Sequence, residues 1–368
     1  AQSQSNLWFI EPEKLDQLGP AIGRGLVWEN DDVAADTVSD PFLFSGYDHR
    51  GLHLLHATGN PVTISLEVDK DGSGIWTPLR QLHCEGYTFV PFVPEEKGTW
   101  IRLRTETATE NLTAAFTYRN GDLRTAEADL IFTELAKPGD HLTGGLVRAR
   151  GGNKGTLAFV PLSEDGSDLG YYEMDETLKL VPRPTKGEPA WSLKHAAIPA
   201  NRFLTIDEAS VLFIDDDGKR WRLPKGKIGK HPLGDYRIAR EIVTERDIFN
   251  ADGTLYELPA RNAGGFSKLR PITTHNRLIH DLCGFRGLLI MSGVAVETPL
   301  DNAHVIKSSD GKTALWAGAI DDLWKLGKPR GTGGPWKDSK VKAGVPSDPY
   351  LMTAYDEKSL TLSSSEPT

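Results

Sequence analysis

The stretch SDPFLFSGYD at residues 39–48 recurs as SDPYLMTAYD at residues 347–356. The match extends outward from these ten residues, so that residues 7–54 align with residues 315–362 without a gap. Paired tryptophans and glycines recur in both copies, including Trp8 with Trp316, Gly19 with Gly327, Gly25 with Gly333 and Trp28 with Trp336. A repeat whose copies stand at the two ends of a chain predicts a closed ring, in which the first and last units are neighbours.

Short strand patterns separated by turn signals run along the whole chain. Runs rich in β-branched and aromatic residues predict strands at residues 62–69, 99–106, 112–119, 156–162, 210–216 and 287–296. Asp-Gly pairs punctuate these runs, beginning at Asp71, Asp165, Asp217, Asp252 and Asp310. Because glycine tolerates a positive φ, an Asp-Gly pair between such runs is typical of a hairpin turn. Helix signals are poor, so the sequence predicts an all-β fold.

The spacing of the repeat copies sets the size of the predicted ring. The interval divides into seven parts of about 44 residues or six of about 51, and propeller blades run roughly 40–50 residues. We therefore predict a single β-propeller domain over residues 1–368, with seven blades favoured and six to eight open. Residues 7–54 and 315–362 are expected to be equivalent blade elements that lie next to each other.

The composition of the chain argues against some classes of binding partner. The formal net charge is −9 and no basic stripe is present, which argues against a nucleic-acid partner. No apolar run reaches the roughly 18 residues that a membrane helix needs, so no membrane partner is predicted. The opening residues AQSQSN are typical of a mature N-terminus left after removal of a signal peptide. We expect a secreted or periplasmic monomer.

The two cysteines, Cys84 and Cys283, leave two alternatives open. They could form one long-range disulfide, or they could be two separate buried thiols.

The densest polar cluster is RPITTHNR at residues 270–277. It precedes an apolar strand pattern, and in a propeller the polar residues that open the innermost strand face the central funnel. His275 is the first catalytic candidate because imidazole titrates near neutral pH. Arg270 and Arg277 could clamp a carboxylate, and Asn276 is a further substrate-binding candidate. The alternative is that His275 and Asn276 satisfy backbone groups of a turn.

Four more residues are candidates from weaker signals. Arg246 stands in a second charged cluster, and Arg202 follows an asparagine as Arg277 does, so both are expected to bind substrate. His49 differs between the two repeat copies, and His83 adjoins a cysteine, so these two histidines are the next catalytic candidates.

No metal site or required cofactor is predicted. The histidines at 49, 53 and 56 would not all point to one face of a strand, which argues against a zinc site. The run Asp215-Asp216-Asp217 resembles calcium ligands, but the turn that Asp217-Gly218 makes also explains it. A structural calcium ion stays an open alternative.

With this cluster in an acidic all-β chain, the protein resembles the seven-bladed β-propeller lyases and glycosidases that act on rhamnose–glucuronate linkages of arabinogalactan or ulvan. The resemblance covers the architecture of the whole chain and residues 270–277. It implies an oligo- or polysaccharide substrate, a catalytic histidine, a neutralised uronate carboxylate and, in some members, a central cation.

The resemblance implies a polysaccharide lyase that works by β-elimination at a uronate. Two alternatives stay open. One is an α-L-rhamnosidase-like glycoside hydrolase on the same substrates, and the other is a non-catalytic propeller that binds glycans or proteins.

Overall fold

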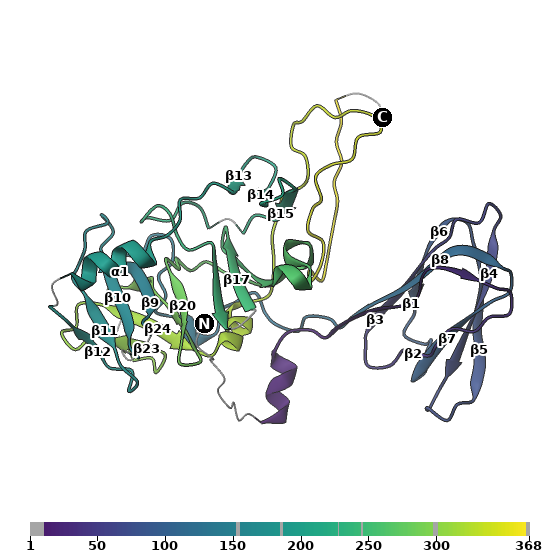
Figure 1. Cartoon of the computed structure of the whole chain (residues 1–368), viewed down its shortest axis with the longest axis horizontal. Helices are drawn as coiled ribbons and strands as arrows, with labels where there is room; N and C mark the ends of the chain where they lie inside the picture. The colour runs from purple at the N-terminus through teal and green to yellow at the C-terminus, as the bar shows by residue number, and fades with distance from the viewer. Residues whose placement is uncertain are drawn as a thin grey trace. The chain divides into compact units, whose positions relative to one another are not determined.

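The computed structural model describes residues 11–151, 155–184, 187–226, 228–243, 246–296 and 301–365. The chain divides into two compact units, where the sequence predicted one domain. Unit 2 is residues 19–123, and unit 1 comprises residues 1–18 and 124–368. Both consist mainly of antiparallel sheets (Figure 1). The all-β prediction is confirmed, whereas the propeller and its seven blades are not.

Unit 2 contains the strands β1 (Ile22–Val33), β2 (Phe42–Leu43), β3 (His49–Leu55), β4 (Val62–Asp69), β5 (Trp76–Cys84), β6 (Tyr87–Phe92), β7 (Trp100–Thr105) and β8 (Thr109–Arg119). One sheet has the order β1-β8-β3-β6 and the other β2-β7-β4-β5, and the two form a sandwich (Figure 1). Successive strands change sheet except at the β4–β5 hairpin. This is the order of a jelly roll.

One hydrophobic core fills the space between the sheets of unit 2. Leu52 and Leu54 of β3 and Ile64 of β4 are fully buried in it, while the residues between them are less buried, as the two-residue period of a strand requires. Cys84 is a free thiol in this core, and Cys283 is a free thiol in unit 1. The alternative of two separate buried thiols is therefore confirmed.

The described residues of unit 1 form four antiparallel sheets. The first contains β9 (Leu142–Ala149), β10 (Leu157–Leu162), β11 (Tyr172–Met174), β12 (Leu180–Pro182) and β22 (Val294–Ala295). The second contains β13 (Leu204–Ile206), β14 (Val211–Ile214) and β15 (Arg220–Leu223). The third is β16 (Ala239–Val243), β17 (Arg246–Ala251), β18 (Thr254–Pro259) and β19 (Arg270–Thr274), and the fourth is β20 (Leu282–Phe285), β21 (Leu288–Met291), β23 (Val305–Lys307) and β24 (Ala314–Gly318).

Helices in the described part of the chain are short. They are the α-helix α1 (Glu188–Ala196) and the 3₁₀ helices η1 (Pro12–Gln17), η2 (Leu130–Phe132), η4 (Arg261–Ala263), η5 (Gly265–Lys268) and η6 (Ile320–Leu326). None of the helices in the described ranges has the length and apolar character needed to cross a membrane.

The Asp-Gly pairs lie where the sequence predicted hairpins. All five stand in connections between paired antiparallel neighbours, namely β4–β5, β10–β11, β14–β15, β17–β18 and β23–β24. Only the β17–β18 connection is a two-residue turn, since Ala251 pairs with Thr254. There Asp252 and Gly253 have φ values of 47° and 80°, which are typical of a type I′ turn.

A buried carboxylate joins the first strands of three sheets in unit 1. Asp281 is fully buried just before β20, and its Oδ1 accepts hydrogen bonds from Arg237 Nε (2.7 Å) and Arg240 Nη1 (3.1 Å). Its Oδ2 accepts from the backbone N–H of Val147 in β9 (3.0 Å). Arg240 lies in β16 and also donates to the carbonyl of Val147 (2.9 Å). The ion pairs therefore hold β9, β16 and β20 together.

The two repeat copies differ in local structure, contrary to their expected equivalence. Residues 22–33 form β1, whereas the aligned residues 330–341 contain a single bridge, from Thr332 to Lys225, and no strand. The copies also lie largely in different units. Their neighbours explain the difference, because residues 22–33 pair with β8, whereas residues 330–350 make only isolated bridges, from Thr332 to Lys225 and from Tyr350 to Arg222 of β15.

The Asp281 ion pairs can be tested by substitution. Asp281→Asn should lower the free energy of unfolding of unit 1 by about 3–5 kcal/mol, because Arg237 would keep a buried charge without its carboxylate. Thermal and urea unfolding followed by circular dichroism would measure the loss. Asp217→Asn is the matched control, since Asp217 pairs with Arg261 at the surface, where ion pairs contribute little. Equal stability of the two variants would contradict this role of Asp281.

Candidate functional site

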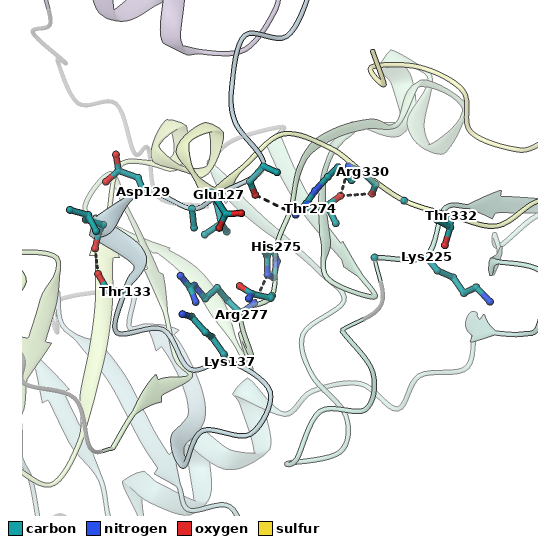
Figure 2. Close-up of a pocket in the computed structure, with 17 residues that line it drawn as sticks. Glu127, Asp129, Thr133, Lys137, Lys225, Thr274, His275, Arg277, Arg330 and Thr332 are labelled. Atoms are coloured by element: carbon teal, nitrogen blue, oxygen red, sulfur yellow. Dashed lines mark hydrogen bonds between the residues drawn. The ribbon is translucent and has the colours of Figure 1, made fainter. Parts of the chain in front are cut away.

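A pocket of about 570 Å³ opens in unit 1 at the end of β19 (Figure 2). Its wall comes from residues 126–137, 274–277 and 326–332, together with Lys225 and Gly226. Four basic side chains line it, those of Lys137, Lys225, Arg277 and Arg330, and we refer to it as the cationic pocket. Residues 326–332 belong to the second repeat copy, which the sequence did not predict to form a site.

The turn before β18 fixes the backbone at His275. The N–H of His275 donates to the carbonyl of Gly253 (2.8 Å), and the hydroxyls of Thr254 and Thr274 bond to each other (2.9 Å). A Cβ on Gly253 would lie only 2.8 Å from the carbonyl oxygen of His275. Both this close approach and the positive φ require glycine, so the Asp-Gly turn positions the pocket residue.

His275 lies in the pocket wall as a neutral ring. Its Nδ1 accepts a hydrogen bond from the N–H of Arg277 (2.9 Å), and its buried Nε2 has no hydrogen-bond partner among the described residues. The proton of the neutral ring must therefore be on Nε2. Burial, together with the charge of Arg277, lowers the pKa of His275 to about 3. At neutral pH the ring is therefore neutral, and taking up a second proton is unfavourable.

Arg277 carries a buried positive charge at the pocket wall. It is 5% exposed, and its Nε and Nη1 have no hydrogen-bond partner among the described residues. Burial lowers its pKa from the ordinary value, while Asp140, Glu134 and Glu127 oppose that shift. The guanidinium still remains charged at neutral pH, because arginine side chains in proteins do not lose their proton there. A buried charge with unsatisfied N–H groups would be stabilised by an anionic ligand.

The other basic side chains differ in whether their charged groups already make hydrogen bonds within the protein. Lys225 Nζ donates to the carbonyls of Asp207 and Glu208, and Arg330 Nη2 donates to the carbonyl of Ala126. Lys137 Nζ makes no hydrogen bond or ion pair with any residue that the structure describes. Figure 2 shows the ends of Lys137 and Arg277 directed toward the same side of the pocket. These two cations are available to a ligand.

Two carboxylates also line the cationic pocket. Asp129 caps helix η2, because its Oδ1 accepts from the N–H of Ile131 (3.0 Å). Glu127 is exposed at the pocket wall. The pocket therefore combines two carboxylates with four basic side chains.

Among the predicted site residues, only His275, Asn276 and Arg277 line the cationic pocket. Arg270 lies at the other end of β19, with its guanidinium 5.0 Å from the ring centroid of Trp324. It is held by packing on that ring and is not part of the pocket wall.

The other two predicted substrate-binding arginines also lie outside the pocket wall. Arg246 forms ion pairs with Glu257 (2.8 Å) and Asp321 (2.9 Å), which commit its guanidinium. Arg202 is exposed before β13.

The other two candidate histidines belong to unit 2. His49 opens β3 and His83 lies in β5, so they are on different sheets of the sandwich. The Nδ1 of His83 forms a hydrogen bond with Thr63 Oγ1 (3.1 Å). Neither residue belongs to the wall of the cationic pocket.

Sequence reasoning missed Lys137, Arg330 and Glu127. Arg330 could have been found from the glycines at 327, 331 and 333, which mark a segment of close backbone approach. No local pattern marks Lys137 or Glu127, because contacts distant in sequence bring them to His275.

Within the described ranges, no group of three or more His, Cys, Asp or Glu side chains is arranged to hold a metal ion. No model of a known protein family matches the chain, and a search of curated proteins finds none with significant similarity. Function is therefore inferred from the chemistry of the pocket.

The depressed pKa of His275 predicts a dependence of stability on pH. The unfolded histidine titrates near about 6.5, so the unfolded state binds more protons between that pH and about 3. The stability contributed by neutral His275 is fully present above this window and is lost as the pH falls through it. His231, whose pKa burial lowers to about 4, should add to the same loss.

The variant His275→Asn should lose stability less steeply at acid pH, because its amide oxygen can still accept from the N–H of Arg277 and does not titrate. Urea midpoints between about pH 7 and pH 4 would measure the slope. His195→Asn is the control, since His195 is an exposed histidine of unit 1 and should leave the slope unchanged. Parallel slopes for His275→Asn and the parent protein would contradict the assignment.

Proposed function

We propose that unit 1 binds an anionic oligo- or polysaccharide in the cationic pocket and cleaves it next to a uronate by β-elimination. The observation that carries the proposal is Arg277, a buried guanidinium with unsatisfied N–H groups beside the Nε2–H of His275. A uronate carboxylate supplies the negative charge and the acceptor oxygens that these donors lack.

The pocket contains the groups that an elimination needs. Arg277 neutralises the carboxylate, with His275 donating a hydrogen bond to it, and the C5 proton becomes more acidic. Glu127 takes that proton, and the released electron pair forms a double bond between C4 and C5. The bond from C4 to the leaving oxygen breaks, and Lys137 gives that oxygen a proton. The tautomer of His275 is the reason for giving it a donor role in place of the acid–base role expected from the sequence.

A glycoside hydrolase is the second candidate, because Glu127 and Asp129 both line the pocket. A hydrolase uses two carboxylates on either side of the scissile bond. Since Asp129 is engaged as the cap of η2, only Glu127 is left for chemistry, and the lyase is the better supported of the two.

The architecture expected from the sequence stays part of the proposal. Three sheets of unit 1 meet through β9, β16 and β20, an arrangement that would suit the inner strands of propeller blades. We propose that the sheets of unit 1 are blades of this kind, in a monomer that is secreted or periplasmic.

Incubation of the full chain with gum arabic and with ulvan tests the proposed reaction. A rise in the absorbance of unsaturated uronates is the expected result. New reducing ends without that absorbance would instead support the hydrolase. Binding without either product would contradict both enzymes and support a binding domain.

Arg277→Lys should lower kcat/KM by roughly 10²-fold or more, because lysine loses the planar array of donors. Glu127→Gln should lower kcat by a similar factor with little change in KM, since it removes the proposed base. Arg202→Lys, the same substitution outside the pocket, is the control and should stay within about twofold of the parent. Unchanged kcat/KM in Arg277→Lys would contradict the proposed site.

A further inference from the structure

The outer face of the β1-β8-β3-β6 sheet of unit 2 carries a cluster of rings. We define it as the aromatic platform, made of Tyr87 and Phe89 of β6 and His53 of β3. His53 pairs directly with Phe89 across the two strands. Tyr87 is 59% exposed and Phe89 is 50% exposed, whereas Leu52 and Leu54, on the opposite face, are fully buried. The platform therefore lies outside the core.

Hydrogen bonds hold the platform rings in place. His53 Nδ1 bonds to the hydroxyl of Tyr87 (2.8 Å), and His53 Nε2 bonds to Thr117 Oγ1 of β8 (3.1 Å). The ring centroid of His53 lies 4.8 Å from that of Phe89 and 6.1 Å from that of Tyr87. Rings fixed in this way lose little conformational freedom when a ligand binds.

A glycine lets Phe89 lie against the sheet. A Cβ on Gly51 of β3 would lie 2.7 Å from the ring of Phe89, so the ring lies across the space that a side chain there would fill. Ala115, the partner of His53 on β8, is also small. The result is an exposed ring face beside a shallow strip of small residues.

The positions that adjoin the platform rings on β3 and β8 are uncharged, and the nearest charged residue across the sheet is Arg24 of β1, which pairs with Thr117. The outward positions next to it on β3 and β8 are Gly51, Leu55, Thr113, Ala115 and Thr117. A surface that binds anionic lipid would need lysine or arginine at these positions. An uncharged ligand that combines an apolar face with hydroxyl groups matches this site.

We propose that the aromatic platform is a second carbohydrate-binding site, which holds an uncharged sugar ring of a polysaccharide. The C–H groups on one face of a pyranose carry partial positive charge and pack against the negative face of an aromatic ring. The sugar hydroxyls then bond to the hydroxyl groups of Tyr87 and Thr117, which His53 holds in place. This site holds polymer and takes no part in bond cleavage, and its existence does not depend on the proposed reaction.

Native gel electrophoresis of the full chain tests the proposal, with gum arabic, ulvan or a neutral β-glucan cast in separate gels. At least one polymer should slow migration of the protein. Phe89→Ala and Tyr87→Ala should each weaken the apparent affinity by about tenfold, because each removes a stacking face. Trp100→Ala is the matched control, since Trp100 is a partly exposed aromatic residue of β7 in the other sheet and should keep the parent affinity.

Substitutions in the cationic pocket and in the aromatic platform should have different effects on cleavage and on polymer binding. Arg277→Lys should lose cleavage yet keep the retardation that Phe89→Ala loses, and Phe89→Ala should keep cleavage of a short soluble uronate substrate. Unchanged thermal midpoints would show that the ring variants fold. Migration of the parent protein unaffected by all three polymers, or equal retardation of Phe89→Ala and the parent, would overturn the proposal. Sedimentation that shows a dimer lost in Phe89→Ala would also overturn it, because the face would then join two copies of the chain.

Discussion

The buried carboxylate of Asp281 is the interaction on which the rest of unit 1 depends. A charge can be buried without large loss of stability only where it is paired and hydrogen-bonded, and Asp281 meets Arg237, Arg240 and the N–H of Val147. These partners come from different sheets, so the geometry of the ion pairs restricts how the sheets can pack. The segment from Thr274 to Arg277, which ends four residues before Asp281, lines the cationic pocket.

Arg277, four positions before Asp281, is a buried charge that lacks such hydrogen-bond partners. It is as buried as Arg237, which Asp281 pairs, yet its Nε and Nη1 have no partner in the described part of the chain. Such a charge costs stability in the free protein, and functional sites are where proteins retain costs of this kind. The aromatic platform of unit 2 has contrasting chemistry, with rings and hydroxyls but no formal charge. Together they would suit a polymer that has both uronate and neutral sugar units.

The sequence predicted the features that depend on neighbouring residues. The Asp-Gly hairpins and the grouping of His275 with Arg277 are local, so residue types alone indicate them. Features that depend on distant contacts were not predicted. Gly23 and Gly331 are aligned in the repeat and both allow close approach, but Gly23 contacts the ring of Tyr47 and Gly331 contacts Pro224. The same repeated sequence pattern thus forms a strand in one unit and an irregular segment in the other.

Whether Arg277 binds a carboxylate can be measured by calorimetric titration of the full chain with a uronate oligosaccharide, alongside the same oligosaccharide with its carboxyl groups reduced to alcohols. The uronate should bind, and added salt should weaken its binding, because the proposed contact with Arg277 is an ion pair. Carboxyl reduction should weaken binding to the parent protein by at least about tenfold and should have a much smaller effect on Arg277→Lys. Equal affinity of the parent protein for the uronate and its reduced form would contradict the assignment of the cationic pocket to a carboxylate.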